Sequence, residues 1–191
     1  YELYRCDWSS DVCSSDLVTP VTTPSPADRF DAAALAPGAR VEEYEVLRVL
    51  GGGGFGITYL ARDAHLDLQV ALKEYFPADL LARDPEGAVA PRTGDPEARQ
   101  RFTAGLQRFV EEARALAAFR HPNIVRVLRY FGTRGTAYIV MEYESGQPLR
   151  QWLPRQPPLT RAALLAVVGP LLDGLEAVHA AGFLHRDIKP D

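Results

Sequence analysis

The chain has 191 residues, of which 47% are hydrophobic, and a formal net charge of -4 at pH 7. That length suits one domain, or part of a larger one, with enough apolar material for a core. The mild negative charge provides no basic surface for nucleic acid, and no apolar run approaches the roughly 20 residues needed to span a bilayer. We therefore expect a soluble chain that contacts neither nucleic acid nor membrane.

The first 17 residues do not resemble natural protein sequence. Residues 7–17, DWSSDVCSSDL, match the translation of a widely used sequencing-adapter primer over eleven positions. Segments of this kind are excluded from fold reasoning, so we expect residues 1–17 to be foreign to the gene. Cys6 and Cys13, the only two cysteines, are set aside with them. The alternative is a genuine Ser/Asp-rich disordered tail. Residues 18–40, rich in Thr and Pro, are predicted to form a linker.

A strand is predicted from Val41 onward, where apolar and β-branched residues alternate with polar ones. It runs into GGGGFGIT at residues 51–58, which satisfies the pattern G-x-G-x-x-G through Gly51, Gly53 and Gly56. A second strand-like run follows, so the glycines form a hairpin turn and do not open a helix. Such a turn can hold phosphates, because missing Cβ atoms let backbone amides approach anionic oxygens. A hairpin turn without any ligand stays open as an alternative.

The next predicted strand carries Lys73 in the run Val-Ala-Leu-Lys at residues 70–73. A lone lysine at the end of a strand is ordinarily only a solvated side chain. Its position just after a glycine hairpin instead predicts an ammonium group beneath the loop, where phosphates would lie. Ala71 is small enough to leave room for a purine. Residues 74–100 contain four prolines and two glycines, so we expect a long irregular connection of unassigned role.

Residues 97–120 have the periodicity of an amphipathic helix, with apolar side chains every three or four positions. These are Phe102, Leu106, Phe109, Ala113, Leu116 and Phe119. Glu111 and Glu112 are the candidate partners for Lys73. Glu112 is preferred, because it shares a helix face with Leu116 and Phe119.

Apolar, β-rich runs at residues 125–130 and 136–141 flank a glycine-containing turn and predict a hairpin. With the three strands before them, they complete a five-stranded antiparallel sheet. Helices are then predicted for residues 148–153 and 160–181, with Thr160 as the N-cap and Gly182 closing the second helix. The pattern is that of an α+β fold.

The last seven residues, HRDIKPD at 185–191, match the catalytic loop H-R-D-x-x-x-x-N of protein kinases. The glycine hairpin, the Val-Ala-Leu-Lys strand, the glutamate helix, HPNIV at 121–125 and MEYESG at 141–146 precede it in the order found in kinases. Over about residues 44–191 the chain thus resembles a bacterial eukaryotic-like Ser/Thr protein kinase. The resemblance implies a bilobal kinase domain at residues 41–191, with a complete small lobe containing one helix and only the start of the helical large lobe.

The resemblance also implies roles for individual residues. Lys73, paired with Glu112, would hold the α- and β-phosphates of ATP, Asp187 would accept the proton of the substrate hydroxyl, and Lys189 would neutralise the γ-phosphoryl group. Met141 would be the gatekeeper beside the adenine, with the Glu142 carbonyl and the Glu144 amide on the purine edge. The implied nucleotide-binding residues are Leu50, Gly51, Gly53, Gly54, Phe55, Gly56, Thr58, Ala71, Lys73, Met141, Glu142 and Glu144.

The resemblance implies ATP-dependent phosphorylation of protein Ser/Thr hydroxyls in the cytoplasm, with Mg²⁺ as a cofactor. The metal-binding Asn and D-F-G motifs are expected beyond Asp191, so the 191 residues alone should be inactive. A membrane anchor further along the gene is left open. Two alternatives remain: a pseudokinase that binds ATP as a scaffold, and a small-molecule phosphotransferase of kinase-like fold.

Overall fold

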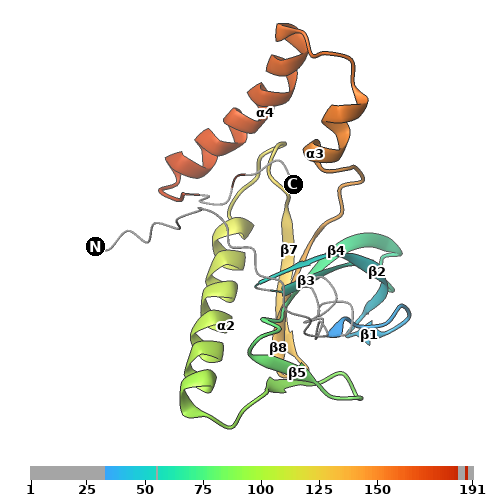
Figure 1. The fold of residues 1–191 in the computed structure, drawn as a ribbon, viewed down its shortest axis with the longest axis vertical. Helices are drawn as coiled ribbons and strands as arrows, with labels where there is room; N and C mark the ends of the chain where they lie inside the picture. Colours follow the sequence, from blue (N-terminus) through green and yellow to red (C-terminus); the bar gives the residue numbers. More distant parts are fainter. Residues whose placement is uncertain (1–32, 55, 185–187, 189–191) are drawn as a thin grey trace, which may run out of the picture.

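The computed structural model describes residues 33–54, 56–184 and 188. Several sequence predictions fall outside these residues: the foreign segment 1–17, most of the linker, and the site residues Phe55, Asp187 and Lys189. The described part of the chain comprises one large sheet, a long helix beside it, a small hairpin, and two further helices (Figure 1).

The large sheet has six antiparallel strands in the order β1-β2-β3-β4-β8-β7. The strands are β1 (Arg40–Val41), β2 (Tyr44–Gly53), β3 (Gly56–Asp63), β4 (Leu68–Tyr75), β7 (Val127–Thr133) and β8 (Thr136–Glu142). The five predicted strands are all present. The sixth, β1, is only two residues long and pairs back onto β2 through a tight turn in which Glu42 has a φ of 53°. Such a short strand has no periodicity that a sequence pattern could reveal.

The two faces of this sheet are covered differently. Residues directly opposite on neighbouring strands project to the same face, and successive residues alternate between faces. Thr58 lies opposite Lys73, whereas Ile57 lies opposite Glu74. The Glu74 face holds the larger core, which includes Val46, Ile57, Tyr59, Leu72, Tyr138 and Val140. Leu35, which lies within the predicted linker, is also buried there at 5% exposure.

Helix α2 (Pro96–Ala117) covers the Lys73 face of the sheet. It begins where the Asp95 carboxylate accepts a hydrogen bond from the Glu97 amide at 3.2 Å, a standard N-cap. Phe109 and Ala113 are buried against β7 and β8, as Figure 1 shows for the helix as a whole. A Cβ atom on Gly105 would lie 1.9 Å from the Tyr75 hydroxyl oxygen, so this glycine lets β4 and α2 approach closely.

The connection at residues 74–100 is more ordered than its sequence predicts. It contains an antiparallel pair of short strands, β5 (Leu81–Arg83) and β6 (Val89–Pro91). Three apolar side chains of this connection, Phe76, Leu81 and Val89, fill the larger core. The Val89 amide also donates to the Arg134 carbonyl at 2.7 Å, in the turn between β7 and β8. The expectation of an irregular connection was therefore wrong, because strands of three residues next to prolines leave no recognisable period.

The chain after β8 forms α3 (Leu149–Trp152), the 3-10 helix η1 (Leu153–Arg155) and α4 (Arg161–Ala180). The predicted cap is present: the Thr160 hydroxyl accepts from the Ala163 amide at 3.2 Å. Helix α4 lies beyond the end of the sheet (Figure 1), and Gly174 is its buried residue. By length and composition α4 could cross a membrane, with a mean hydropathy of 1.5, although core helices of soluble proteins pass the same test. The expectation of no membrane contact was based on unbroken apolar runs, and Asp173 and Glu176 interrupt the apolar sequence of α4.

Candidate functional site

Strand β4 and helix α2 bring Lys73 and Glu112 together. The Lys73 ammonium nitrogen lies 3.3 Å from a Glu112 carboxylate oxygen and 5.6 Å from the centre of the Phe109 ring. The side chains remain accessible, at 31% exposure for Lys73 and 52% for Glu112. Glu111 turns elsewhere and accepts a hydrogen bond from Gln107 at 2.9 Å within α2. The structure thus selects Glu112 over Glu111 as the partner of Lys73.

The glycine-rich stretch forms the predicted hairpin between β2 and β3, with Gly53 opposite Gly56 as its last pair. Thr58 lies opposite both Gly51 and Lys73, so the hairpin runs directly alongside the strand that carries the lysine. Apart from the adjoining residues, no atom lies within 4 Å of the position a Cβ would take on Gly51, Gly53 or Gly54, so there is free space beside these three glycines.

Gly56 differs from the other glycines of the hairpin. A Cβ atom on Gly56 would lie 2.0 Å from the Glu74 carbonyl oxygen. A distance this short forbids any side chain, so Gly56 is required where β3 packs against the end of β4. The turn end of the hairpin is therefore held against the residue that follows Lys73.

The opposite end of this face is apolar and leads toward the segment after β8. Ala71 lies opposite Leu60 on one side and Met141 on the other. Met141 is half-buried and packs against the α2 core, and Glu142 is the last residue of β8. Leu50 is 36% exposed at an irregularity of β2, and Glu144 is exposed. A cation at one end and small apolar side chains at the other suit a ligand with a phosphate end and a flat ring.

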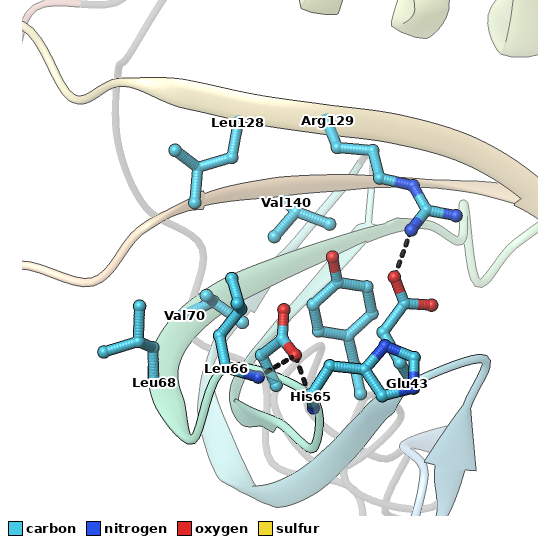
Figure 2. Close-up of a pocket in the computed structure, with 10 residues that line it drawn as sticks. Glu43, His65, Leu66, Leu68, Val70, Leu128, Arg129 and Val140 are labelled. Carbon is cyan, nitrogen blue, oxygen red and sulfur yellow. Dashed lines mark hydrogen bonds and ion pairs between the residues drawn. The ribbon is translucent and has the colours of Figure 1, made fainter.

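A hollow of about 450 Å³ lies on the other face of the sheet (Figure 2). Its floor contains Tyr44, Val70 and Val140, and Leu66, Leu68, Leu128 and Arg129 are among its other lining residues. Arg129 forms an ion pair with Glu43 beside it, and the Asp63 carboxylate accepts the His65 amide at 2.8 Å to hold the β3–β4 turn. Neither Lys73 nor the glycine hairpin reaches this hollow, so it is not part of the candidate site.

The sequence pattern did not identify a buried polar cluster directly behind the site. Glu74 is completely buried and is bonded by Tyr59, Tyr138 and Arg83. Burial raises the pKa of the two phenols, and the negative charge of Glu74 raises it further. Burial alone would lower the pKa of Arg83, but the hydrogen bond and charge of Glu74 outweigh it and raise that pKa. The available signal was a glutamate inside an otherwise apolar strand.

The protein kinase domain model matches residues 44–191, so the chain belongs to the protein kinase family. It is 34% identical over 154 residues to the serine/threonine-protein kinase Pkn1 of Myxococcus xanthus, covering 81% of this chain and 19% of that protein. It is 33% identical over 147 residues to the serine/threonine-protein kinase PrkC of Bacillus subtilis, covering 77% and 20%. The recognition of a bacterial Ser/Thr kinase from the sequence is confirmed.

Solved structures agree with the assigned fold. The chain matches the PpkA-294 apo form with a TM-score of 0.76 and 37% identity, over 83% of this chain and 56% of that one. It matches the Mycobacterium tuberculosis PknI kinase domain with a TM-score of 0.57 and 30% identity, over 82% and 55%. The kinase-like fold class is thus confirmed. The chain spans about a fifth of the length of the curated relatives it matches.

Proposed function

We propose that the protein uses ATP to phosphorylate Ser or Thr hydroxyls of proteins in the cytoplasm. The observation that carries the proposal is the ion pair between Lys73 and Glu112, at 3.3 Å, on the strand next to the glycine hairpin. A cation held in this position can bind the α- and β-phosphates, while the free space beside Gly51, Gly53 and Gly54 lets phosphate oxygens approach that backbone.

Each end of the site would then have a distinct task. Ala71 and Met141 would contact the adenine, and backbone groups of Glu142 and Glu144 would bond its edge. Thr58 and Leu50 would lie against the nucleotide from β3 and β2. Asp187 would take the proton from the attacking hydroxyl, and Lys189 would offset the charge of the γ-phosphoryl group. Glu112 keeps the Lys73 ammonium in place when no nucleotide is bound.

Magnesium is the metal that the kinase family uses with ATP. The described residues contain no group of three or more His, Cys, Asp or Glu side chains that could hold a metal ion. The roles above do not depend on a metal ion.

The test compares two variants in the gene product that contains this chain. Asp187→Asn should keep ATP affinity and lower turnover about 100-fold or more, because it removes the acid–base group and keeps the shape. Lys73→Met should lower both ATP affinity and turnover, since the lysine touches the nucleotide. ATP binding is measured by calorimetry, and turnover by phosphate transfer to a generic Ser/Thr-containing protein. Glu111→Gln is the control.

The outcomes separate the proposal from its alternatives. ATP binding without transfer by the unaltered protein would indicate a pseudokinase scaffold. Transfer to small alcohols but not to protein would indicate a small-molecule phosphotransferase. Full turnover by Asp187→Asn would reject the assigned base.

A further inference from the structure

Glu74 directly follows Lys73 on β4 and projects to the opposite face of the sheet. Its side chain is fully buried. One carboxylate oxygen accepts from the Tyr138 hydroxyl at 2.6 Å, and the other from the Tyr59 hydroxyl at 2.8 Å and from Arg83 at 2.6 Å. An ionised carboxylate is stable in such a place only when it is paired and hydrogen-bonded.

Arg83 comes from β5, in the connection between β4 and α2. Its guanidinium also donates to the Ala33 carbonyl at 2.7 Å and to the Gly87 carbonyl at 3.1 Å, and it lies 4.9 Å from the centre of the Phe76 ring. The Arg83 side chain is 9% exposed. One arginine thus joins the segment before β1, the β5–β6 hairpin and strand β4.

The position of Glu74 is linked to two parts of the candidate site. Lys73 is its covalent neighbour, so any rotation or shift of β4 at Glu74 moves the lysine. The Glu74 carbonyl occupies the space a side chain on Gly56 would need, 2.0 Å from that Cβ position, so it also lies against the turn end of the glycine hairpin. A buried ion pair adds little net stability compared with apolar residues of the same volume. In some proteins such a pair instead specifies one arrangement of the elements that it joins.

We propose that Glu74 and Arg83 are positioning residues for the phosphate end of the nucleotide site. Their buried ion pair holds β4 so that Lys73 and the glycine hairpin meet the same phosphates. This assigns a role to the connection at residues 74–100: it supplies Arg83, which binds β4 on the face opposite Lys73. The inference rests on the proposed function. It predicts that loss of the ion pair weakens the binding of ligands that carry phosphates and leaves the binding of adenosine unchanged.

The experiment measures binding of ATP, ADP and adenosine by calorimetry to the full-length protein and to Arg83→Met. We expect Arg83→Met to weaken ATP and ADP binding about 10-fold, within the range for coupled residues of one network, and to leave adenosine binding unchanged. The matched control is Arg92→Met, in the same connection, whose guanidinium donates to the Ala78 carbonyl at 3.1 Å and makes no bond to Glu74. It should bind all three ligands normally.

Two further variants make the result decisive. In a Lys73→Met background, Arg83→Met should weaken ATP binding by a smaller factor than in the unaltered protein, because part of its effect acts through the lysine. If Arg83→Met fails to fold by circular dichroism, the Glu74→Gln/Arg83→Met pair, which leaves no unpaired buried charge, replaces it and should show the same selective loss.

Equal losses for ATP and adenosine, unchanged ATP binding, or an undiminished effect in the Lys73→Met background would each overturn the inference. The failure of the proposed function has a different signature. An unaltered protein that binds ATP no better than adenosine would reject the phosphate site itself. An unaltered protein that prefers ATP, together with an Arg83→Met variant that keeps this preference, would reject only the positioning role.

Discussion

Lys73 and Glu74 are neighbours on β4, yet their charged groups differ in burial and in hydrogen bonding. Lys73 is 31% exposed and forms an ion pair with Glu112, itself 52% exposed, at 3.3 Å. Glu74 is buried at 0% exposure and accepts three hydrogen bonds of 2.6 to 2.8 Å. A ligand can approach an exposed pair, whereas the buried pair cannot open without breaking the core. One strand thus presents an available charge on one face and a fixed charge on the other.

The difference in burial implies a difference in energy. An exposed ion pair contributes about 0 to 1 kcal/mol, because water and salt screen it. Removing one partner of a buried pair costs about 3 to 5 kcal/mol, because the other charge is left without compensation. Mutations on the two faces of β4 should therefore separate function from stability.

The largest expected effect contrasts Glu74→Ala with Lys73→Ala. Glu74→Ala leaves the buried Arg83 charge without its counter-ion and two tyrosine hydroxyls without their acceptor, and should lower the free energy of unfolding by about 3 to 5 kcal/mol. Lys73→Ala should lower it by under about 1 kcal/mol. Urea denaturation followed by circular dichroism measures both. Equal losses would contradict the contrast between the two faces.

The second prediction concerns the link between the two faces at Gly56. Gly56→Ala places a methyl group against the Glu74 carbonyl and should destabilise the protein by about 1 to 3 kcal/mol, as overpacking does. Gly54→Ala is the matched control, since no atom lies within 4 Å of its Cβ position. The measurement is again urea denaturation, and a tolerated Gly56→Ala would show that β3 and β4 can separate there.

The third prediction uses the titration of Tyr138. Burial and the charge of Glu74 raise the pKa of this phenol in the folded protein above its usual value of about 10. Above that pH the unfolded chain loses a proton that the folded chain keeps, so the free energy of unfolding falls as pH rises. One such tyrosine contributes a slope of about 1.4 kcal/mol per pH unit.

Tyr138→Phe should remove the contribution of this tyrosine to the fall in the free energy of unfolding between pH 10 and 11. Urea denaturation at each pH measures it. Tyr130→Phe is the control, because that ring is 39% exposed. An unchanged slope in Tyr138→Phe would mean that the phenol ionises freely in the folded state.

The sequence was sufficient for those parts of the fold that have a period or a local cap. Alternation located the first of the five longer strands and apolar, β-rich runs located the others, three- and four-residue spacing located α2 and its apolar face, and Thr160 marked the start of α4. Spacing on α2 also chose Glu112 over Glu111. In the candidate site, the glycine hairpin and Lys73 were recognisable because short motifs specify their neighbours along the chain.

Features made by contacts between distant residues could not be predicted. The β5–β6 hairpin consists of three-residue strands stabilised by packing into the core, and β1 has only two residues. The buried state of Glu74 depends on Arg83, nine residues later, and on Tyr138, 64 residues later. No local pattern reports such partners, and a glutamate is rarely fully buried unless it is paired.

The smallest expected effect, and the sharpest test of the exposed face, is the coupling between Lys73 and Glu112. A double-mutant cycle of Lys73→Met and Glu112→Gln should give a coupling energy of about 0.2 to 1 kcal/mol in urea denaturation, because both side chains are exposed. ATP affinity and turnover should show a larger coupling between the two residues than stability does. The two variants should combine less than additively in both, since Glu112 acts only by holding the lysine that meets the phosphates.

Glu111→Gln provides the control for this cycle, because Glu111 is the adjacent acid on α2 and bonds Gln107. It should combine additively with Lys73→Met in both stability and ATP binding. Additive losses for Glu112 with coupled losses for Glu111 would reverse the assignment of the partner. Coupling between Lys73 and Glu112 in stability but not in ATP affinity would show that the ion pair has a structural role only. The lysine would then bind the nucleotide without help from Glu112.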